Sequence, residues 1–282
     1  MPIHPLAIVD ATAKLAPGVD VGPLAIIEAG VIIGEGCTIA AGAILKTGTT
    51  LGPHNKVAER ATIGGLPQHV NVPDQVGTIA IGSHNTIREG VTIHRALHEG
   101  HTTLVGDHNL LMVGAHVAHD CVVGNHAIFA NNATLGGHVV VHDRAYVSGN
   151  VAVHQFCHIG RLAMVGGLAR VIKDVPPYVT IDGNTGYVVG LNTIGLRRAG
   201  YSHADISQLK AAYRTIYRSG LKWNAILERM QTEFNTGPAA EFGVFFQQIS
   251  RGIVPERRLP PGAGLKLGEE AMGEPILRKQ AG

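Results

Sequence analysis

The chain has 282 residues, a net charge of +2 and only 5% aromatic residues. Such a balanced charge argues against a nucleic acid as the main partner, and three widely separated cysteines do not make a disulfide framework. No apolar run is long enough for a transmembrane segment and no secretory leader is visible, so we expect a cytoplasmic protein. With few aromatic rings, small and β-branched aliphatic residues must fill the core.

An aliphatic residue, replaced once by Phe129, returns at every sixth position over Val9–Ile63, Ile81–Ile93 and Val105–Val171. A period of six fits neither the 3.6-residue turn of a helix nor the alternation of an open sheet. It fits a short strand followed by a turn, and three such units close one triangular coil of about 18 residues. The sequence therefore predicts a mainly β protein in which residues 1–183 form a parallel β-helix of hexapeptide repeats.

The repeat is interrupted twice and then ends. Residues 64–80 and 97–104 break the phase and are expected to leave the coil as loops, where a rigid scaffold commonly carries binding groups. Past the repeat the apolar spacing becomes helical, which predicts a small C-terminal α-helical domain over residues 184–254. Residues 255–282 have no period and are expected to form a flexible tail. The apolar faces of the three expected helices run over Ile206–Tyr217, Trp223–Phe234 and Phe242–Ile249.

The six-residue phase also places the polar side chains. Residues 18 positions apart stack in adjacent coils, so His119 is expected above Gly137 and Asp120 above His138. Cys121 falls on an inward position, which excludes it as a nucleophile. An imidazole beside a carboxylate and a backbone N–H is the set of groups that a general base with an oxyanion site needs.

Two further features allow alternative interpretations. A zinc site would need three convergent ligands, and the zinc-dependent carbonic anhydrases of this fold use two histidines five residues apart. No two histidines here have that spacing, so no metal is expected. The column Asn131, Gly149 and Gly167 is nearly bare of side chains, and it is either a groove for an extended apolar chain or only a relief of tight turns. Flat prism faces also favour packing as a trimer.

Three segments resemble one family. They are "NLLMVGAHVAHDCVVGNHAIFANNATLGGHV", "AVHQFCHIG" and "VPPYVTIDGNTGYVVGLNTIGLRRAGYS", and the likeness extends to about Pro255. The chain is similar to the UDP-N-acetylglucosamine O-acyltransferases of lipid A biosynthesis. The resemblance implies a left-handed coil and a homotrimer with active sites between subunits. It also implies transfer of a (3-hydroxy)acyl chain from acyl carrier protein to the 3-OH of the UDP-sugar, without cofactor or acyl-enzyme.

The resemblance also implies roles for individual residues. His119 matches the general base, Asp120 the acid that orients it, and Gly137 the N–H that stabilises the oxyanion. The implied substrate-binding positions are Gln68, His69, Asn71, His94, His116, His138, His154, Gln155, Asn192 and Arg198. The implied acyl groove is the column Asn131, Gly149 and Gly167, with Gly167 at its end. The basic residues that could meet the carrier protein, or be ordinary surface charges, are Arg161, Arg170, Lys173, Arg214 and Arg218.

Four positions depart from the family pattern. His69 stands where Asp is common, Asn71 where Lys is common, Ile194 replaces a Glu, and Ala199 replaces the second of two Arg. The acceptor is therefore either UDP-N-acetylglucosamine, which we take as the default, or its 3-amino analogue. Two other hypotheses are a related enzyme that N-acylates an O-acylated sugar, and a non-catalytic or metal-binding solenoid. The former commonly carries an additional N-terminal domain, whereas the repeat begins here by Val9.

Overall fold

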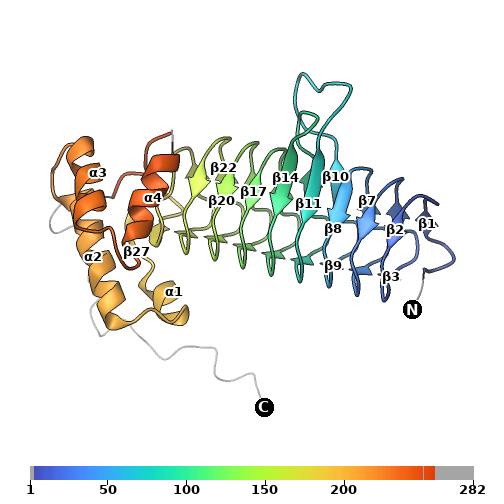
Figure 1. The fold of residues 1–282 in the computed structure, drawn as a ribbon, viewed down its shortest axis with the longest axis horizontal. Helices are drawn as coiled ribbons and strands as arrows, with labels where there is room; N and C mark the ends of the chain where they lie inside the picture. The colour runs from blue at the N-terminus through green and yellow to red at the C-terminus, as the bar shows by residue number, and fades with distance from the viewer. Residues whose placement is uncertain (1–2, 250, 258–282) are drawn as a thin grey trace, which may run out of the picture.

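Each hexapeptide forms a short strand and a turn, and three strands complete one coil. The structure is a computed structural model that describes residues 3–249 and 251–257. Its coils stack into a long triangular prism with the helices at the C-terminal end (Figure 1). Almost every strand pairs in parallel with the strand one coil away, as His116 with Thr134 and Val117 with Leu135. The prediction of a left-handed parallel β-helix followed by a small helical domain is confirmed.

The three faces of the prism are three sheets. The strands of the first are β1 (Ile8–Val9), β4 (Ile26–Ile27), β7 (Ile44–Leu45), β10 (Thr62–Gly65), β13 (Thr92–His94), β16 (His116–Val117), β19 (Thr134–Leu135), β22 (Ala152–Val153) and β25 (Arg170–Val171). Those of the second are β2 (Lys14–Leu15), β5 (Ile32–Ile33), β8 (Thr49–Leu51), β11 (Thr78–Ile81), β14 (Thr102–Val105), β17 (Val122–Val123), β20 (Val140–Val141) and β23 (His158–Ile159). Those of the third are β3 (Asp20–Val21), β6 (Thr38–Ile39), β9 (Lys56–Val57), β12 (Thr86–Ile87), β15 (Leu110–Leu111), β18 (Ile128–Phe129), β21 (Tyr146–Val147), β24 (Met164–Val165), β26 (Val179–Ile181) and β27 (Val188–Leu191).

The core of the prism is the inward column of small and aliphatic side chains that the period predicts. The cysteines Cys37, Cys121 and Cys157 are all fully buried in it. Burial raises the pKa of Cys121 to about 12 and that of Cys157 to about 11, so both stay protonated thiols at neutral pH. Neither cysteine can serve as a nucleophile, in agreement with the inward phase.

The two loops are narrower than the sequence indicated. Strand β10 continues through Gly65 and β11 begins at Thr78, so the first loop is 66–77 and not 64–80. Strand β13 ends at His94 and β14 begins at Thr102, so the second is 95–101 and not 97–104. The reason is that the flanking residues still find partners one coil away, as Thr78 does in Thr102. Both loops project from the same side of the prism (Figure 1).

The C-terminal unit holds more elements than the three expected helices. Strand β27 turns back and pairs antiparallel with β26, ending the third sheet. A short helix that the apolar pattern did not indicate follows it. The helices are α1 (Thr193–Arg198), α2 (His203–Arg218), α3 (Trp223–Thr232) and α4 (Ala240–Gln248). Ser202 and Asp205 form a capping box that begins α2.

The segment after α4 returns to the prism. The buried Asp174 accepts hydrogen bonds from the backbone N–H groups of His158, at 2.7 Å, and of Arg251, at 3.0 Å. Residues 255–257 then follow the edge of β27, where the Val188 N–H donates to Pro255 O at 2.9 Å and the Arg257 N–H donates to Val188 O at 2.8 Å. The sequence predicted that a flexible tail begins at residue 255, but residues 255–257 are hydrogen-bonded to β27. Residues 258–282 of the predicted tail lie outside the described residues. Over the described ranges, no helix is long and apolar enough to cross a membrane.

Candidate active site

His119 and Asp120 form a hydrogen-bonded pair at one corner of the prism. His119 Nδ1 lies 2.7 Å from Asp120 Oδ2, and both side chains are almost fully buried. Asp120 occupies the left-handed region at φ +59°, which turns its side chain back toward its neighbour. Its N–H donates to Thr103 Oγ1 at 2.8 Å, and its Oδ2 accepts the N–H of Leu97 at 3.0 Å. The corner turn therefore lets two adjacent residues meet.

The electrostatics of the pair determine the tautomer of His119. Burial raises the pKa of Asp120, but the hydrogen bonds from His119 and from the Leu97 N–H outweigh burial, and the pKa lies below its ordinary value. An ionised carboxylate only accepts hydrogen bonds, so His119 Nδ1 carries the proton. The lone pair is then on Nε2, which is the atom available to take a proton from a substrate.

The His119 ring covers Gly137 in the next coil. A Cβ atom at position 137 would lie 2.6 Å from His119 Cε1 and 2.7 Å from Nε2, which is closer than van der Waals contact allows. Only glycine therefore admits the imidazole at this height. Among the described residues the Gly137 N–H has no acceptor. A free N–H beside the basic nitrogen is a suitable donor for an oxyanion.

Both loops fold back onto this corner. The His69 ring meets the His119 ring edge-on at 5.8 Å between centroids, and its Nδ1 accepts the N–H of Asn71 at 3.1 Å. The loops also hydrogen-bond to each other, from Gly77 N–H to Ala96 O at 2.9 Å. His69 and Asn71 therefore lie at the entrance to the site, where the family comparison in the sequence placed substrate contacts.

A second pair of histidines lies on the adjacent strands of the first sheet. His116 Nδ1 is 2.7 Å from Thr92 Oγ1, and the His94 and His116 rings are 5.1 Å apart. Burial, reinforced by the nearby His94, lowers the pKa of His116 to about 4. Burial also lowers the pKa of His94. Both rings are thus neutral at physiological pH and can exchange hydrogen bonds with hydroxyl groups of a sugar.

The remaining expected substrate contacts are not gathered around His119 in one chain. Gln68 is exposed on the first loop, and His154 and Gln155 are exposed one coil beyond Gly137. Asn192 caps α1 by accepting the Gly195 N–H at 2.9 Å, and its Nδ2 donates to Leu162 O at 2.9 Å. Arg198, at the end of α1, is exposed, as is Ile194, while Ala199 is the C-cap of this helix.

The bare column is present on another edge of the prism. Backbone hydrogen bonds link its rungs, from Asn150 N–H to Asn131 O at 2.9 Å and from Leu168 N–H to Gly149 O at 3.0 Å. A Cβ at Gly167 would meet only Gly149 O at 3.5 Å and the edge of Ser148, so the position has space. The column is open to solvent, and Leu168 beside it is 75% exposed. An apolar chain could lie along it.

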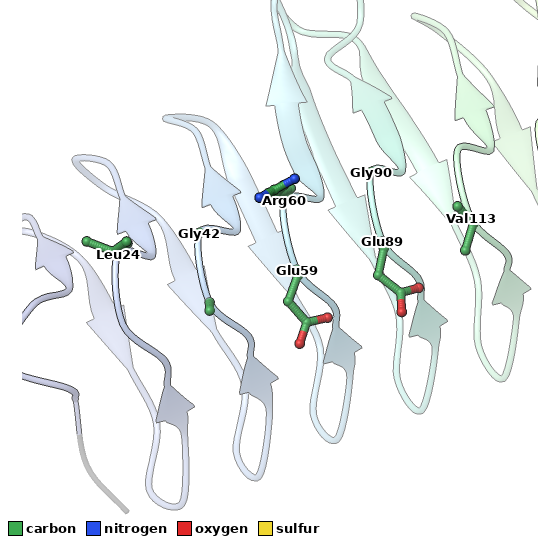
Figure 2. A pocket seen from close by; sticks show the side chains of 8 residues that line it. Leu24, Gly42, Glu59, Arg60, Glu89, Gly90 and Val113 are labelled. Atoms are coloured by element: carbon green, nitrogen blue, oxygen red, sulfur yellow. The ribbon is translucent and has the colours of Figure 1, made fainter.

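The N-terminal half of the same edge is different. Val113 precedes Asn131 in the column, and the Asn132 N–H donates to Val113 O at 2.9 Å. A cavity of about 530 Å³ lies there. Figure 2 shows the carboxylates of Glu59 and Glu89 on successive coils of this cavity. Two carboxylates make this half unsuitable for an acyl chain, so the expected groove would be confined to the C-terminal half.

A separate corner carries four stacked histidines, which we call the histidine ladder. Its members are His54, His84, His108 and His126. Their ring centroids are 4.9, 4.8 and 4.9 Å apart in successive coils. Every one of them is exposed. The ladder lies between the second and third sheets, whereas His119 and Asp120 lie between the first and second.

One group of side chains in the described part of the chain could hold a metal ion. The ligand atoms of His119, Asp120 and His138 all lie within 4.8 Å of one another. His119 Nδ1, however, is already hydrogen-bonded to the carboxylate at a distance typical of a charge-assisted pair. The pair is therefore complete as a base and its orienting acid.

Comparison with known proteins agrees with this geometry. A family model described as UDP-N-acetylglucosamine O-acyltransferase, domain 2, matches residues 174–254, and a bacterial transferase hexapeptide model matches residues 102–137. The acyl-[acyl-carrier-protein]–UDP-N-acetylglucosamine O-acyltransferase of Neisseria gonorrhoeae is 49% identical over 257 residues, which cover 89% of this chain and 98% of that protein. The chain belongs to the UDP-N-acetylglucosamine O-acyltransferase family. It is an acyltransferase, as the resemblance implied.

Further relatives support the assignment of this acyltransferase. The Halorhodospira halophila protein of the same name is 46% identical, covering 89% of this chain and 98% of that one. The solved structure of UDP-N-acetylglucosamine O-acyltransferase from Moraxella catarrhalis superposes with a TM-score of 0.87 at 37% identity, covering 90% of this chain and all of that one. The UDP-N-acetylglucosamine acyltransferase from Bacteroides fragilis gives 0.85 at 37% identity, with the same coverage of both chains.

Sequence reasoning missed three groups around Asp120. These are the Leu97 N–H, the Thr103 hydroxyl and His101, whose Nδ1 is 3.6 Å from Asp120 Oδ1. Leu97 and His101 belong to the second loop, which has no repeat phase and so cannot be placed by counting. The available signal was the unusual density of histidines in that loop, where His98 and His101 stand three residues apart.

Proposed function

We propose that this acyltransferase moves a (3-hydroxy)acyl chain from acyl carrier protein to the 3-OH of UDP-N-acetylglucosamine, in the cytoplasm and in lipid A biosynthesis. The observation that carries the proposal is the His119–Asp120 hydrogen bond, which leaves Nε2 basic above Gly137. The names of the relatives support the same two substrates. No cofactor is needed, since every group that the transfer requires is a side chain or a backbone N–H.

The reaction proceeds by general-base catalysis without an acyl-enzyme. His119 Nε2 takes the proton of the sugar hydroxyl as its oxygen attacks the thioester carbonyl carbon. The new C–O bond gives a tetrahedral oxyanion, which the Gly137 N–H stabilises. The intermediate collapses as the C–S bond breaks, and the imidazolium returns its proton to the leaving thiolate. Asp120 stays ionised and stabilises the imidazolium throughout.

A homotrimer would complete the site. Asn192 and Arg198 come from the C-terminal unit, and no contact joins them to His119 within the described residues of one chain. If Asn192 and Arg198 both contact the nucleotide, the sugar of that nucleotide must lie at His119 of a neighbouring subunit. Flat sheet faces and closed threefold symmetry favour such an arrangement. The groove of Asn131, Gly149 and Gly167 would then receive the acyl chain beside the base of a neighbouring subunit.

The carrier protein is acidic, so exposed basic residues near the helical unit are its expected contacts. Arg170, Lys173 and Arg214 are exposed and form no ion pair within the described part of the chain. Arg161 is instead 3.1 Å from Asp143, and Arg218 is 2.7 Å from Glu256. The three unpaired residues therefore rank ahead of the two paired ones as docking residues.

The acceptor is tested directly with carrier-protein donors of graded chain length and three acceptors. UDP-N-acetylglucosamine is the expected substrate, with its 3-amino analogue as the variant that His69 and Asn71 leave open. The 3-O-acyl sugar tests the related N-acylating reaction. Turnover of only the 3-amino sugar would replace the ester by an amide product, and turnover of none of the three would overturn the proposal.

A resident zinc centre is the rival function, because His119, Asp120 and His138 could hold an ion. It predicts stoichiometric zinc in the purified protein and loss of activity on chelation. General-base catalysis predicts that activity survives exhaustive treatment with a chelator. Elemental analysis before and after that treatment, with the transfer rate measured on the same samples, distinguishes the two.

A further inference from the structure

Asp120 is surrounded by more imidazoles than general-base catalysis requires. Besides His119, its carboxylate faces His101, whose Nδ1 is 3.6 Å from Oδ1, and His138, whose Nε2 is 3.8 Å from Oδ2. The His98 ring follows His101 at 6.0 Å, edge-on. The reaction proposed above uses neither His98 nor His101. One carboxylate with three imidazoles at this range is the donor set that zinc prefers in proteins.

The two longer distances are informative. A separation of 3.6 or 3.8 Å is too long for a hydrogen bond. Two ligands that share one tetrahedral zinc at about 2.0–2.1 Å each lie about 3.4 Å apart. The atoms of His101 and His138 are thus spaced from the carboxylate much as ligands of one ion are. His101 is 63% exposed at its side chain, so its ring can turn toward a common centre.

We propose that this acyltransferase has a reversible, inhibitory site for Zn²⁺ at Asp120. His119 Nδ1, the Asp120 carboxylate and His138 Nε2 are the first three ligands, and His101 swings in as the fourth. Binding shifts His119 to its other tautomer: Nδ1 gives its proton to solvent, Nε2 takes one up, and the ion lies between Nδ1 and the carboxylate. The ion therefore competes with the hydrogen bond that prepares the base. The inhibitory effect rests on the proposed function, whereas the binding does not.

Inhibition follows from the tautomer that the ion imposes on His119. With Nδ1 bound to the ion, Nε2 carries the ring proton and has no lone pair to accept the proton of the sugar hydroxyl, and Asp120 can no longer stabilise an imidazolium. The ring of His138 is ready to ligate, because burial lowers its pKa despite the opposing attraction of Asp120, and a neutral imidazole needs no proton loss. Binding must break the hydrogen bond between His119 Nδ1 and Asp120 and move the ring proton to Nε2, which keeps the affinity moderate and the inhibition reversible.

The test uses chelator-treated full-length protein and free Zn²⁺ held at defined concentrations by a metal buffer. Zinc binding is measured by competition with a chromophoric chelator, and Co²⁺ is added separately to look for the absorption of a tetrahedral centre. The transfer rate is measured in the same buffers. We expect one ion per chain at the Asp120 site, a rate that falls as that site fills, and full recovery with EDTA.

His101→Gln is the decisive variant, because His101 has no role in the proposed reaction. It should keep the basal rate but weaken zinc binding and inhibition by about 10–100-fold, the usual cost of losing a group that supports a metal. His126→Gln is the matched control, since it removes an exposed histidine of the ladder and should leave inhibition unchanged. The double variant His98→Gln/His101→Gln tests whether His98 substitutes for its neighbour.

Each outcome distinguishes this site from the proposed reaction. Equal zinc binding by wild type and His101→Gln, or a transfer rate that zinc does not lower, would overturn the inhibitory site and leave the reaction intact. Binding that weakens by about 10–100-fold in His101→Gln, in a protein that transfers no acyl chain, would support the site while the proposed function fails. Activity that needs zinc would favour the rival metal centre and overturn both proposals.

Discussion

Two corners of the same prism carry histidines and treat them differently. In the histidine ladder the rings lie exposed and almost parallel, 4.8–4.9 Å apart, with mainly each other as partners. At the other corner His119 is buried, faces a carboxylate at 2.7 Å and is overlaid by two loops. Both corners use the same turn, in which a residue such as Asp120 or His126 has a positive φ.

The comparison shows that the repeat fixes where a side chain lies on the prism. The loops that interrupt the repeat give one corner the surroundings that a catalytic base needs. A hexapeptide corner can carry a histidine in coil after coil without changing its surroundings. Only where the loops 66–77 and 95–101 return does a corner become buried, gain a backbone donor for Asp120 and lose solvent. Burial strengthens the charge interactions that prepare a base. Each prediction below tests one of the differences between the His119–Asp120 corner and the rest of the prism.

Removing the base should give the largest effect. His119→Ala leaves no group to accept the sugar proton, and the transfer rate should fall by about 10²–10⁴-fold, as for other lost general bases. His126→Ala, the same change in the ladder, should keep the wild-type rate. Steady-state kinetics of both proteins, with the oligomeric state measured by light scattering, make the comparison. A near-wild-type rate for His119→Ala would contradict the assignment.

Moving the base without removing it should come next. In Gly137→Ala the new Cβ would lie within 2.7 Å of the His119 ring, so the ring must shift. A displacement of about 1 Å in a catalytic group can cost about 10²-fold in rate. The effect should appear in kcat with little change in the unfolding temperature. If the rate is unchanged, the imidazole does not work above Gly137.

Acid should destabilise the fold through His116, which lies on β16 just before the buried corner. The pKa of His116 is about 4 in the folded protein, below the ordinary value of about 6.5 for an unfolded chain. Between those two pH values His116 is protonated in the unfolded state but neutral in the folded state. The free energy of unfolding therefore falls as the pH drops from about 6.5 to 4. The loss is on the order of 3 kcal/mol per chain. Unfolding in denaturant at stepped pH should show it, and His116→Gln should flatten the slope.

Filling the bare column should have a moderate and selective effect. Gly167→Leu would occupy the end of the proposed groove, and each methylene of the acyl chain denied burial costs about 0.8 kcal/mol, or about fourfold in relative rate. Preference should shift toward shorter donors, with the shortest donor unaffected. Competition between carrier proteins loaded with different chain lengths measures this. An unshifted preference would place the end of the groove elsewhere.

Breaking the ladder should give the smallest effect. His108→Gln removes one ring from between two stacked neighbours, and such aromatic contacts are each worth about 0.5–1.5 kcal/mol beyond burial. We expect a small fall in the free energy of unfolding and no change in transfer rate. A rate that falls with stability unchanged would mean that the ladder takes part in catalysis, and the two corners would no longer differ in function.

Most of the prism could be read from the sequence because its rule is local. A residue six positions on has the same environment, so counting alone placed Cys121 inside and stacked Asp120 above His138. The same counting put His119 above Gly137, where its ring lies. Counting in sixes predicts nothing for the segments in which the six-residue period is interrupted. The bounds of both loops, the strand β27 and the return of residues 255–257 depend on pairings with distant residues that no period announces.

The sequence by itself determined the hexapeptide fold, the inward thiols and the alignment of His119 with Gly137, because each follows from one repeated distance along the chain. Only the tertiary structure decided which corner becomes a site. The Leu97 N–H and the Thr103 hydroxyl reach Asp120 from 23 and 17 residues away in the chain. Such contacts depend on the conformation of a loop that lacks the six-residue period, and that conformation is determined by tertiary contacts.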